Sequence, residues 1–471
     1  MGGLTRRALL VGGGVAGAGA LGAGGLAVRN GLRDREPPVP EAQDARGRLL
    51  WSNWSGTAHS YPERRAAPAN EAELLDILTR APAPVRPVGS GHSFTALVPT
   101  DGTLLTLDGM TGIVGYDAAT SQATVRGGTR LADLGPALAA IGQEMANLPD
   151  INKQSIAGAI ATGTHGTGRG IPAVHGAIVA MRIATPSGEL IDCDAARRPD
   201  LFHAARVGLG AFGVVTQVTL QNQPLTRILK RAEVRLTQEV LEDWPALRRR
   251  HRNVEFLTLP FTGHSVTITH DVTDRPVKPR GPDTDMETLA GLKQLRDWFE
   301  FAPSLRRKLA AGELAKIPPE EVVDAGWKLL SNERPVRFNE IEYHLPIEAQ
   351  IPALREVLSA VETRRRDVFF PIEVRVIAPD DAWLSPFFER ESGSIAVHAF
   401  YRESHDFFFS IIEPIFRRHG GRPHWGKLHG LKARDLTALY PRWRDAGEVR
   451  RAIDPEGRML NDYLKGLLLD G

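Results

Sequence analysis

The stretch that decides the fold is residues 155–168, "SIAGAIATGTHGTG". Its fourteen residues carry no charge and most of them are small, so a large ligand can approach the backbone closely. A glycine-rich turn buried against a sheet is the simpler interpretation. Such a turn does not need three threonines, a serine and His165. The stretch therefore predicts a ligand-binding loop.

Two other glycine-containing stretches stand on either side of it. Residues 87–94, "PVGSGHSF", follow an expected strand, and their glycines and serines let backbone N–H groups converge on an anion such as a pyrophosphate. A tight turn with a surface histidine explains this octapeptide equally well. Residues 208–216, "GLGAFGVVT", are a weak signal alone, because glycine turns before strands are common.

In this order and spacing, the three stretches resemble the FAD-binding domain of the vanillyl-alcohol oxidase superfamily. Within it the chain is most similar to the aldonolactone and alditol oxidases, which include the gulonolactone and arabinonolactone oxidases. The resemblance is strong over residues 50–225. It continues through "PIEVR" at 371–375 and "HWGKLH" at 424–429, while residues 226–365 match by position only.

The resemblance implies an α+β fold. It consists of a two-subdomain PCMH-type FAD-binding domain with a mixed sheet, and a cap domain built on a large antiparallel sheet. Helical spacing of apolar residues at 131–142 and 351–367 predicts two helices, and residues 368–378 read as a long strand. The expected segments are 1–44, an export signal and linker; 45–225, the FAD-binding domain; 226–420, the substrate domain; and 421–471, which completes the flavin site.

The same resemblance implies how FAD is held, because this family binds the dinucleotide without a Rossmann fingerprint. His92 stands where many members bond a ring nitrogen to the flavin 8α-methyl group, so a covalent link is expected. The other residues expected to contact the cofactor are Gly89, Ser90, Gly91, Ser93, Ser155, Ile160, Gly163, Thr167, Gly168, Val215, His424 and Lys427.

Glu373 and Arg375 stand two residues apart in "VFFPIEVRVIA", residues 368–378, which is otherwise apolar. On a strand both side chains point to the same face, so they can form one polar patch. An ion pair on a wet face is the alternative, yet buried charges need partners or a purpose. We predict that Arg375 stabilises negative charge on the reduced flavin and that Glu373 accepts hydrogen bonds from substrate hydroxyls.

Three further side chains are catalytic candidates. Lys427 lies between two histidines in a turn-rich segment, where its charge near the flavin pyrimidine favours the anionic reduced ring. His398, in "IAVHAFY", is a candidate base for the hydroxyl proton, although a lone histidine on an apolar strand is more often structural. His165 is likewise a candidate for a structural role, bonding within its loop. The resemblance implies that Ser155 lies beside the flavin ring and the substrate. No His, Cys and carboxylate cluster has metal-ligand spacing, so no metal is predicted.

The N-terminal residues 8–28, "ALLVGGGVAGAGALGAGGLAV", contain a G-x-G-x-x-G pattern at 12–17, with Asp34 downstream, as in dinucleotide-binding loops. Interior glycines each destabilise a helix by about 1 kcal/mol relative to alanine, and no apolar strand presents Asp34. Arg6 and Arg7 ahead of an uncharged stretch indicate instead a twin-arginine export signal. A membrane anchor is a further interpretation, because the stretch is long enough to span a bilayer.

The composition excludes some classes of partner and of crosslink. With 58 basic and 56 acidic residues and no long basic run with interleaved aromatics, a nucleic-acid partner is not expected. Cys193 is the only cysteine, so no intramolecular disulfide forms, which is unusual for an exported protein. Both features suit a protein that folds and takes up its cofactor in the cytoplasm and is exported folded to the periplasm or the medium, with membrane association through the N-terminal segment as a possibility.

We therefore expect hydride transfer from an alcohol carbon to flavin N5, with oxygen reoxidising the flavin and giving hydrogen peroxide. The expected partners are oxygen and a small polyhydroxylated substrate: an aldonolactone, a sugar or an alditol. One alternative is a dehydrogenase of the same fold that passes electrons to a quinone or cytochrome. Pro149, near where the family controls oxygen access, favours the oxidase. The other alternative is a non-catalytic carbohydrate-binding protein, against which the intact glycine loops argue.

Overall fold

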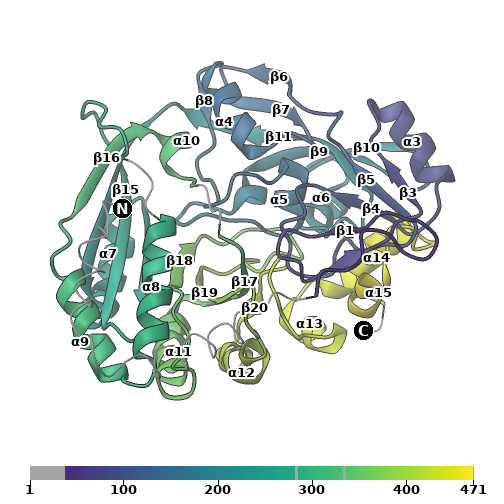
Figure 1. Cartoon of the computed structure of the whole chain (residues 1–471). Helices are drawn as coiled ribbons and strands as arrows, with labels where there is room; N and C mark the ends of the chain where they lie inside the picture. Colours follow the sequence, from purple (N-terminus) through teal and green to yellow (C-terminus); the bar gives the residue numbers. More distant parts are fainter. Residues whose placement is uncertain (1–37, 282–284, 333–335, 470–471) are drawn as a thin grey trace.

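Two small sheets form the first part of the chain in the computed structural model, which describes residues 38–281, 285–332 and 336–469 (Figure 1). One is a parallel sheet in which β3 (Arg64–Ala66) and β4 (Val85–Val88) flank β5 (Thr103–Thr106), and α3 (Glu71–Arg80) connects β3 to β4. The other is antiparallel, in the order β10 (Leu190–Asp194), β9 (Ile178–Ala184), β11 (Val214–Gln221), β7 (Gln122–Arg126) and β6 (Ile113–Asp117).

Three helices accompany these sheets: α4 (Leu131–Ala139), α5 (Ile156–Ala161) and α6 (Pro199–Ala205). The helix predicted at 131–142 is therefore confirmed and ends at Ala139, with Leu131, Leu134 and Leu138 buried. The glycine-rich stretch at 155–168 contains α5. Ser155 Oγ accepts a hydrogen bond from the backbone N–H of Gly158 at 3.3 Å, the usual arrangement of an N-cap serine.

An eight-stranded antiparallel sheet dominates the second part of the chain, which confirms the α+β fold with a large antiparallel sheet. Its strands follow the order β16 (Glu320–Ala325), β13 (Arg227–Leu236), β15 (His264–Val272), β14 (Asn253–Leu259), β18 (Ile372–Ile377), β19 (Ser392–Phe400), β17 (Phe338–Pro346) and β20 (Arg422–Pro423). Strand β18 is shorter than the strand predicted at 368–378. Pro371 lacks the N–H that a ladder requires, so residues 368–371 stay outside the sheet.

The register of this sheet places apolar and charged residues in a single row. Directly opposed residues of antiparallel strands share one face. From β13 to β17 the row reads Val234, Val266, Leu257, Glu373, Ala396 and Glu342. We call this the inner face. Within this row the residues are apolar on β13, β15 and β14 and charged on β18 and β17; Glu255 of β14 lies on the same face two residues before Leu257.

Helices cover both faces of the sheet. On the outer face lie α7 (Thr237–Arg250) and α11 (Gln350–Arg364), the latter confirming the helix predicted at 351–367. The indole of Trp244 packs edge-on against Phe256 with ring centres 4.9 Å apart and donates to Gln350 Oε1 at 2.8 Å. Helices α8 (Asp285–Phe299) and α9 (Pro303–Leu314) lie at the apolar end of the inner face, where Leu314 packs with Leu259.

The C-terminal helices return to the first part of the chain: α13 (Ala433–Leu439), α14 (Trp443–Ile453) and α15 (Asp462–Leu468). Figure 1 shows them in yellow beside the purple N-terminal strands. Asn461 Nδ2 donates to the carbonyls of Ala96 and Pro99 at 2.9 and 2.8 Å. Short elements complete the fold: β1 (Trp51–Ser52) pairs β2 (His59–Ser60), β8 (Gln143–Glu144) pairs β12 (Gln223–Pro224), and α10 (Gly326–Leu329) and α12 (Glu413–Arg418) are single short helices.

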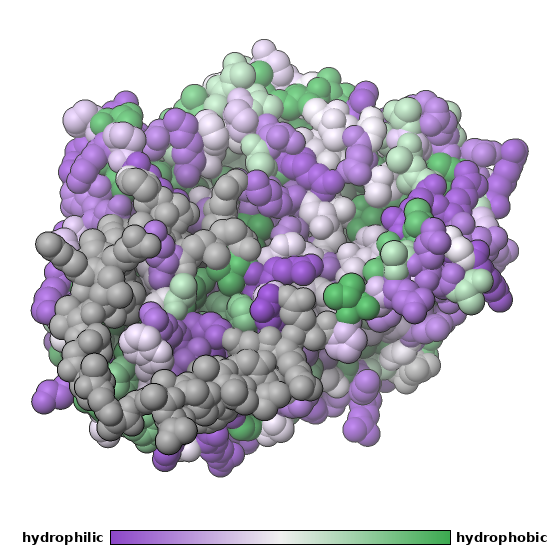
Figure 2. Space-filling model, viewed as in Figure 1, coloured by the Kyte–Doolittle hydropathy of each residue, from purple (hydrophilic) through white to green (hydrophobic). Residues whose placement is uncertain are grey.

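The visible surface is mixed in character. Figure 2 shows hydrophilic residues over much of this face, with hydrophobic residues in separate patches. Within the described ranges, no helix is both long enough and apolar enough to cross a bilayer. The predicted export signal and possible anchor, and the G-x-G-x-x-G pattern at 12–17, lie outside the described residues.

Candidate active site

Two adjoining cavities share the lining residues His92, Ser93, Gln154 and Thr162. The glycine cavity is walled by the three glycine-containing stretches recognised in the sequence, at 87–93, 154–162 and 208–215. The sheet cavity lies against the inner face of the eight-stranded sheet and is closed by the 149–151 loop and by residues of α8.

The walls of the glycine cavity leave no room for side chains at key positions. A Cβ on Gly89 would lie 2.4 Å from Ser155 Oγ, and one on Gly128 would lie 2.0 Å from the carbonyl oxygen of Leu107. Backbone therefore forms much of this wall, and convergent backbone N–H groups are suited to phosphate. The residues present fit the pyrophosphate and the adenosine of FAD.

A chain of hydrogen bonds fixes the loop at 87–93. Ser90 Oγ donates to the carbonyl of Lys153 and accepts from the guanidinium of Arg130, which also pairs with Asp108 at 2.6 Å. Arg130 stands beside Ser90 at the edge of the glycine cavity, and its charge is paired with Asp108, which lines that cavity. The sequence reasoning did not identify Arg130.

His92 stands at the junction of the two cavities. Its ring lies 5.4 Å from that of Trp54, tilted by 31°. Burial lowers the pKa of His92 to about 4, and the positive charges of Lys427 and Arg130 act in the same direction. The imidazole is therefore neutral at pH 7, with a ring nitrogen available as a nucleophile.

Arg375 lies between two carboxylates on the inner face. Its Nε donates to Glu255 and its Nη2 to Glu373, both at 2.7 Å, and the three side chains are only 9–12% exposed. Because two carboxylates share one guanidinium, burial and the charge of Glu255 raise the pKa of Glu373 to about 8, against the opposing effect of Arg375. The raised pKa favours the neutral form of Glu373, which can donate as well as accept hydrogen bonds.

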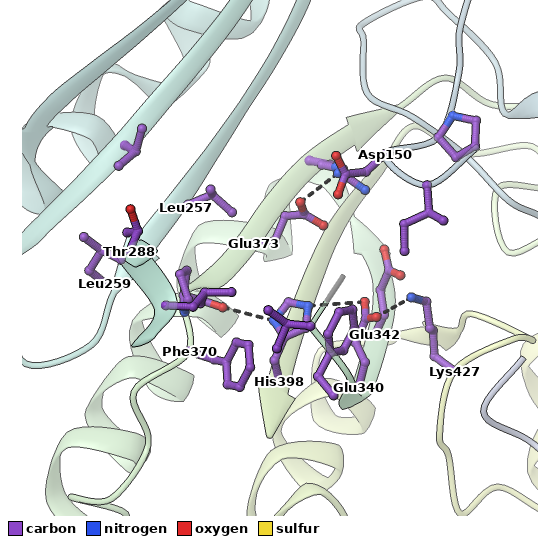
Figure 3. Close-up of a pocket in the computed structure, with 18 of the residues that line it drawn as sticks. Asp150, Leu257, Leu259, Thr288, Glu340, Glu342, Phe370, Glu373, His398 and Lys427 are labelled. Atoms are coloured by element: carbon purple, nitrogen blue, oxygen red, sulfur yellow. Dashed lines mark hydrogen bonds and ion pairs between the residues drawn. The ribbon is translucent and has the colours of Figure 1, made fainter. Parts of the chain in front are cut away.

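His398 is oriented by the backbone. A carbonyl oxygen only accepts, so His398 Nδ1 donates to Pro371 O at 3.0 Å, and the lone pair is on Nε2, 3.7 Å from Glu340 Oε1. Burial and the charge of Lys427 lower the pKa of His398, although Glu340 opposes them. Figure 3 shows His398 between Phe370 and Glu340 in the cavity. Its Nε2 is thus neutral and able to take a proton.

Lys427 completes the charged end of the sheet cavity. Its ammonium pairs with Glu340, whose side chain is 4% exposed. Burial disfavours the charged form, but Glu340 and Glu342 outweigh it and raise the pKa of Lys427. The lysine therefore remains charged, as the predicted electrostatic role requires.

Glu342 forms a second polar group with His165 and His344. His165 Nδ1 donates to the carbonyl of Gly166 at 2.8 Å, and its Nε2 lies 2.9 Å from Glu342 Oε1. Among the described residues, the ligand atoms of His165, Glu342 and His344 come within 4.8 Å of one another, a grouping that linear spacing does not show. His165 thus bonds within its own loop, as the structural interpretation expects, and also lines the sheet cavity.

The structure brings most of the predicted residues to the two cavities. Those lining the glycine cavity are Gly89, Ser90, Gly91, His92, Ser93, Ser155 and Val215. Those lining the sheet cavity are Glu373, Arg375, His398, His424 and Lys427, with His92 and Ser93 shared.

Four of the predicted FAD contacts line neither cavity. Ile160 is fully buried in the hydrophobic core. Gly163 takes a left-handed turn, with φ of +72°. Thr167 Oγ1 donates to a carbonyl of β14 at 2.6 Å, and the N–H of Gly168 to a carbonyl of β18 at 2.8 Å. This end of the glycine-rich stretch anchors the loop to the large sheet.

Ser155 stands apart from the other catalytic candidates. It lines the glycine cavity only, and its hydroxyl accepts the N–H of Gly158 at the start of α5. Arg375, Glu373, His398 and Lys427 all line the other cavity. Ser155 thus caps α5, and its position beside the flavin ring and the substrate stays a prediction.

Sequence reasoning missed several residues of the sheet cavity. Glu340 and Glu342 stand two apart in the apolar strand "FNEIEYHLP", the same signal that identified Glu373 and Arg375, so they could have been found. Glu255 is known as a partner of Arg375 only from strand register. Asp150 and Trp54, in loops that line the cavity, carry no such signal.

Comparison with protein families gives two matches. The family model described as D-arabinono-1,4-lactone oxidase matches residues 218–467. The model described as FAD binding domain matches residues 62–194. Together they cover most of both cavities, apart from Trp51 and Trp54 and the wall of the glycine cavity at 205–215.

Several curated proteins are similar over nearly their whole length. An L-gulono-1,4-lactone dehydrogenase of Mycobacterium tuberculosis is 36% identical over 427 residues, which is 89% of this chain and 99% of that protein. The L-gulonolactone oxidase of Mus musculus is 28% identical, over 88% of this chain and 98% of that protein. An alditol oxidase of a Streptomyces species is 27% identical, over 88% and 98%.

Solved structures show the same fold at low sequence identity. A cholesterol oxidase of Brevibacterium sterolicum superposes with a TM-score of 0.71 at 17% identity, covering 92% of this chain and all of that one. At this identity the likeness concerns the fold alone. It agrees with the PCMH-type architecture that the sequence predicts.

Proposed function

Because this chain belongs to the D-arabinono-1,4-lactone oxidase family and is an FAD-dependent oxidoreductase, we propose that it oxidises an alcohol group of a small polyhydroxylated compound. The substrate class is an aldonolactone, a sugar or an alditol, and oxygen is the acceptor, reduced to hydrogen peroxide. The observation that supports this most is the group of Glu373, Arg375 and His398, which stands in the cavity next to the glycine loops.

The chain's residues divide the work of binding. The loops at 87–93 and 208–215 and the edge of α5 hold the FAD, with Arg130 at the pyrophosphate and Lys427 at the charged end of the sheet cavity. The chemistry that FAD supplies when bound is acceptance of the hydride from the carbinol carbon and delivery of the two electrons to the acceptor.

Three side chains act on the substrate. Glu373, whose pKa is raised, binds substrate hydroxyls and orients the carbinol. His398 Nε2 takes the hydroxyl proton as the C–H bond breaks. Arg375, fixed by two carboxylates, stabilises negative charge that develops in the transition state without having to reorganise.

The second part of the proposal concerns the electron acceptor. Pro149 lines the sheet cavity beside Asp150, and this is where the proposed control of oxygen access lies. Two similar proteins are named oxidases, while the M. tuberculosis relative is named a dehydrogenase. A dehydrogenase that passes electrons to a quinone or cytochrome is therefore the second candidate.

A substrate panel with two acceptors tests the proposal. Purified holoprotein is assayed with lactones, alditols and sugars, first with oxygen alone and then with an artificial dye acceptor. We expect oxygen consumption matched by one peroxide per substrate oxidised. Turnover with the dye and none with oxygen assigns the dehydrogenase. No turnover with any member of the panel contradicts the substrate class.

We propose that His92 carries the FAD covalently. Its position at the junction of the cavities and its neutral ring at pH 7 support this. Acid-precipitated protein should stay yellow, and a peptide containing His92 should carry the mass of FAD. His92→Ala should still bind FAD, noncovalently, and turn over more slowly. His59→Ala, a change at an exposed histidine, is the control and should keep the link. Release of all flavin by acid from the wild-type protein rejects the proposal.

We also propose that the protein is exported in its folded state by the twin-arginine route. The basis is Arg6 and Arg7 ahead of a weakly hydrophobic stretch, together with a single cysteine. Replacing both arginines by lysine should retain the protein in the cytoplasm, as measured by cell fractionation. The same change at Arg33 and Arg35 should leave export as it is. Export of the Arg6→Lys, Arg7→Lys variant at the wild-type level would remove the twin-arginine interpretation.

A further inference from the structure

The sheet cavity extends well beyond its charged group. Past Glu373 most of the lining consists of aliphatic side chains of β13, β14 and β15 and of the two helices that cover them, with Thr288, Glu233 and Glu320 as the polar members. We call this part the apolar lobe and define it by Val234, Leu257, Leu259, Val266, Leu292 and Leu314. Figure 3 shows the change of character: Leu257 and Leu259 lie on one side, Glu340 and Lys427 on the other, and Glu373 and His398 between them.

Strand register gives the lobe its length and direction. Leu257 is directly opposite Glu373, Val266 is opposite Leu257, and Val234 is opposite Val266. Neighbouring strands are about 4.8 Å apart, so the row of aliphatic residues reaches roughly 14 Å from Glu373. The glycine loops adjoin the cavity at His92 and Gln154. The apolar lobe extends from Glu373 in the direction away from these loops.

An aliphatic wall contributes little to the binding of a molecule that is polyhydroxylated throughout. The hydroxyl groups of such a molecule lose hydrogen bonds to water when they lie against aliphatic side chains, which offer none in return. The charged end already provides the donors and acceptors that such a molecule needs. The lobe therefore matches a second, apolar part of the ligand.

We propose that the natural substrate is amphiphilic, with a hydroxylated head at Glu373, Arg375 and His398 and an apolar chain or ring system in the lobe. This inference rests on the proposed alcohol oxidation and narrows its substrate class. The charges fix the orientation, since the reverse placement would bury the aliphatic group against Arg375 and its carboxylates.

Paired substrates test the proposal. L-gulono-1,4-lactone is compared with its 6-O-octyl ether, and xylitol with its 1-O-octyl ether, by steady-state kinetics of the holoenzyme. Each buried methylene strengthens binding by about fourfold, so burial of half the octyl chain lowers KM by about 100-fold or more. Isothermal titration with octyl and methyl β-D-glucopyranoside gives the same comparison without turnover.

Two variants localise the effect. Leu292→Gln places an amide in the lobe and should reduce the octyl-to-parent ratio of kcat/KM by about tenfold. Leu309→Gln makes the same change on α9, where the side chain is 42% exposed and outside the lobe, and should leave the ratio unchanged. Flavin content and circular dichroism confirm that both variants fold.

The outcomes separate this inference from the proposed function. Turnover of the parent compounds with no gain from the octyl group overturns the inference and leaves the function intact. Failure to oxidise any parent or ether overturns the function, and equal binding of octyl and methyl glucoside then overturns the inference as well. Competition of the octyl ethers with a short-chain quinone acceptor, without a lower KM, assigns the lobe to the acceptor and also overturns it.

Discussion

Anaerobic reduction of the bound flavin should be about 100- to 1000-fold slower in the Arg375→Ala variant, with flavin content unchanged. As hydride passes from the substrate to the flavin, the flavin gains negative charge that the ground state lacks. A fixed guanidinium nearby stabilises that transition state. Arg375 is fixed because Glu255 and Glu373 each hold it at 2.7 Å in a nearly buried setting. Stopped-flow absorbance of the flavin measures the rate.

Two comparisons show whether this effect is catalytic. Arg375→Lys should recover only part of the rate, because lysine lacks the planar fork that bonds both carboxylates. Arg450→Ala removes an equally buried guanidinium, 3% exposed on α14, and should lower stability without changing flavin reduction. If well-folded, flavin-loaded Arg375→Ala is reduced at the wild-type rate, the arginine has only a structural role.

Replacement of His398 by asparagine should slow the same step by about 100- to 10,000-fold, the usual contribution of a positioned base. Asparagine can donate its amide to Pro371 O as His398 Nδ1 does at 3.0 Å, so the tie to the backbone is kept and the basic nitrogen is lost. The loss should appear in kcat more than in KM, because the proton moves only in the transition state.

The pH dependence gives an independent measure of the same role. The base must be neutral, and burial lowers its pKa below the ordinary value of about 6.5. The rate of the wild-type enzyme should therefore hold through pH 6.5 and fall only at lower pH, as Nε2 becomes protonated. The His398→Asn variant should lack this acid limb. A variant that keeps both the rate and the limb would transfer the base function to another group.

The parts of the site that sequence predicts are those whose signal is local. The glycine stretches at 87–93 and 155–168 predict a site lined by backbone. The two-residue spacing of Glu373 and Arg375 predicts that both side chains lie on one face of a strand. The glycine-cavity contacts at Ser90 and Val215 followed from the resemblance. In each case the physical requirement lies within about a dozen residues.

The parts that sequence does not predict depend on register and on long-range packing. Glu255 meets Arg375 because β14 pairs with β18, 120 residues away in sequence. The apolar lobe exists because three strands align valines and leucines in one row. Ile160 and Thr167 line neither cavity, because long-range packing places Ile160 in the hydrophobic core and bonds Thr167 to a carbonyl of β14.

The return of the C-terminal segment sets the time at which the sheet cavity is complete. Thr95 Oγ1 donates to the carbonyl of Trp425 at 2.9 Å, across 330 residues of chain, and the N–H of Phe94 donates to the carbonyl of Gly426. A ribosome adds about 5–20 residues per second, so roughly 15–65 s pass between the synthesis of Thr95 and that of Trp425. Until residues 424–427 are made, the sheet cavity lacks the wall that carries His424 and Lys427, whereas the stretches that wall the glycine cavity are all made by residue 215. The loops proposed to hold FAD are therefore synthesised well before the catalytic cavity can close.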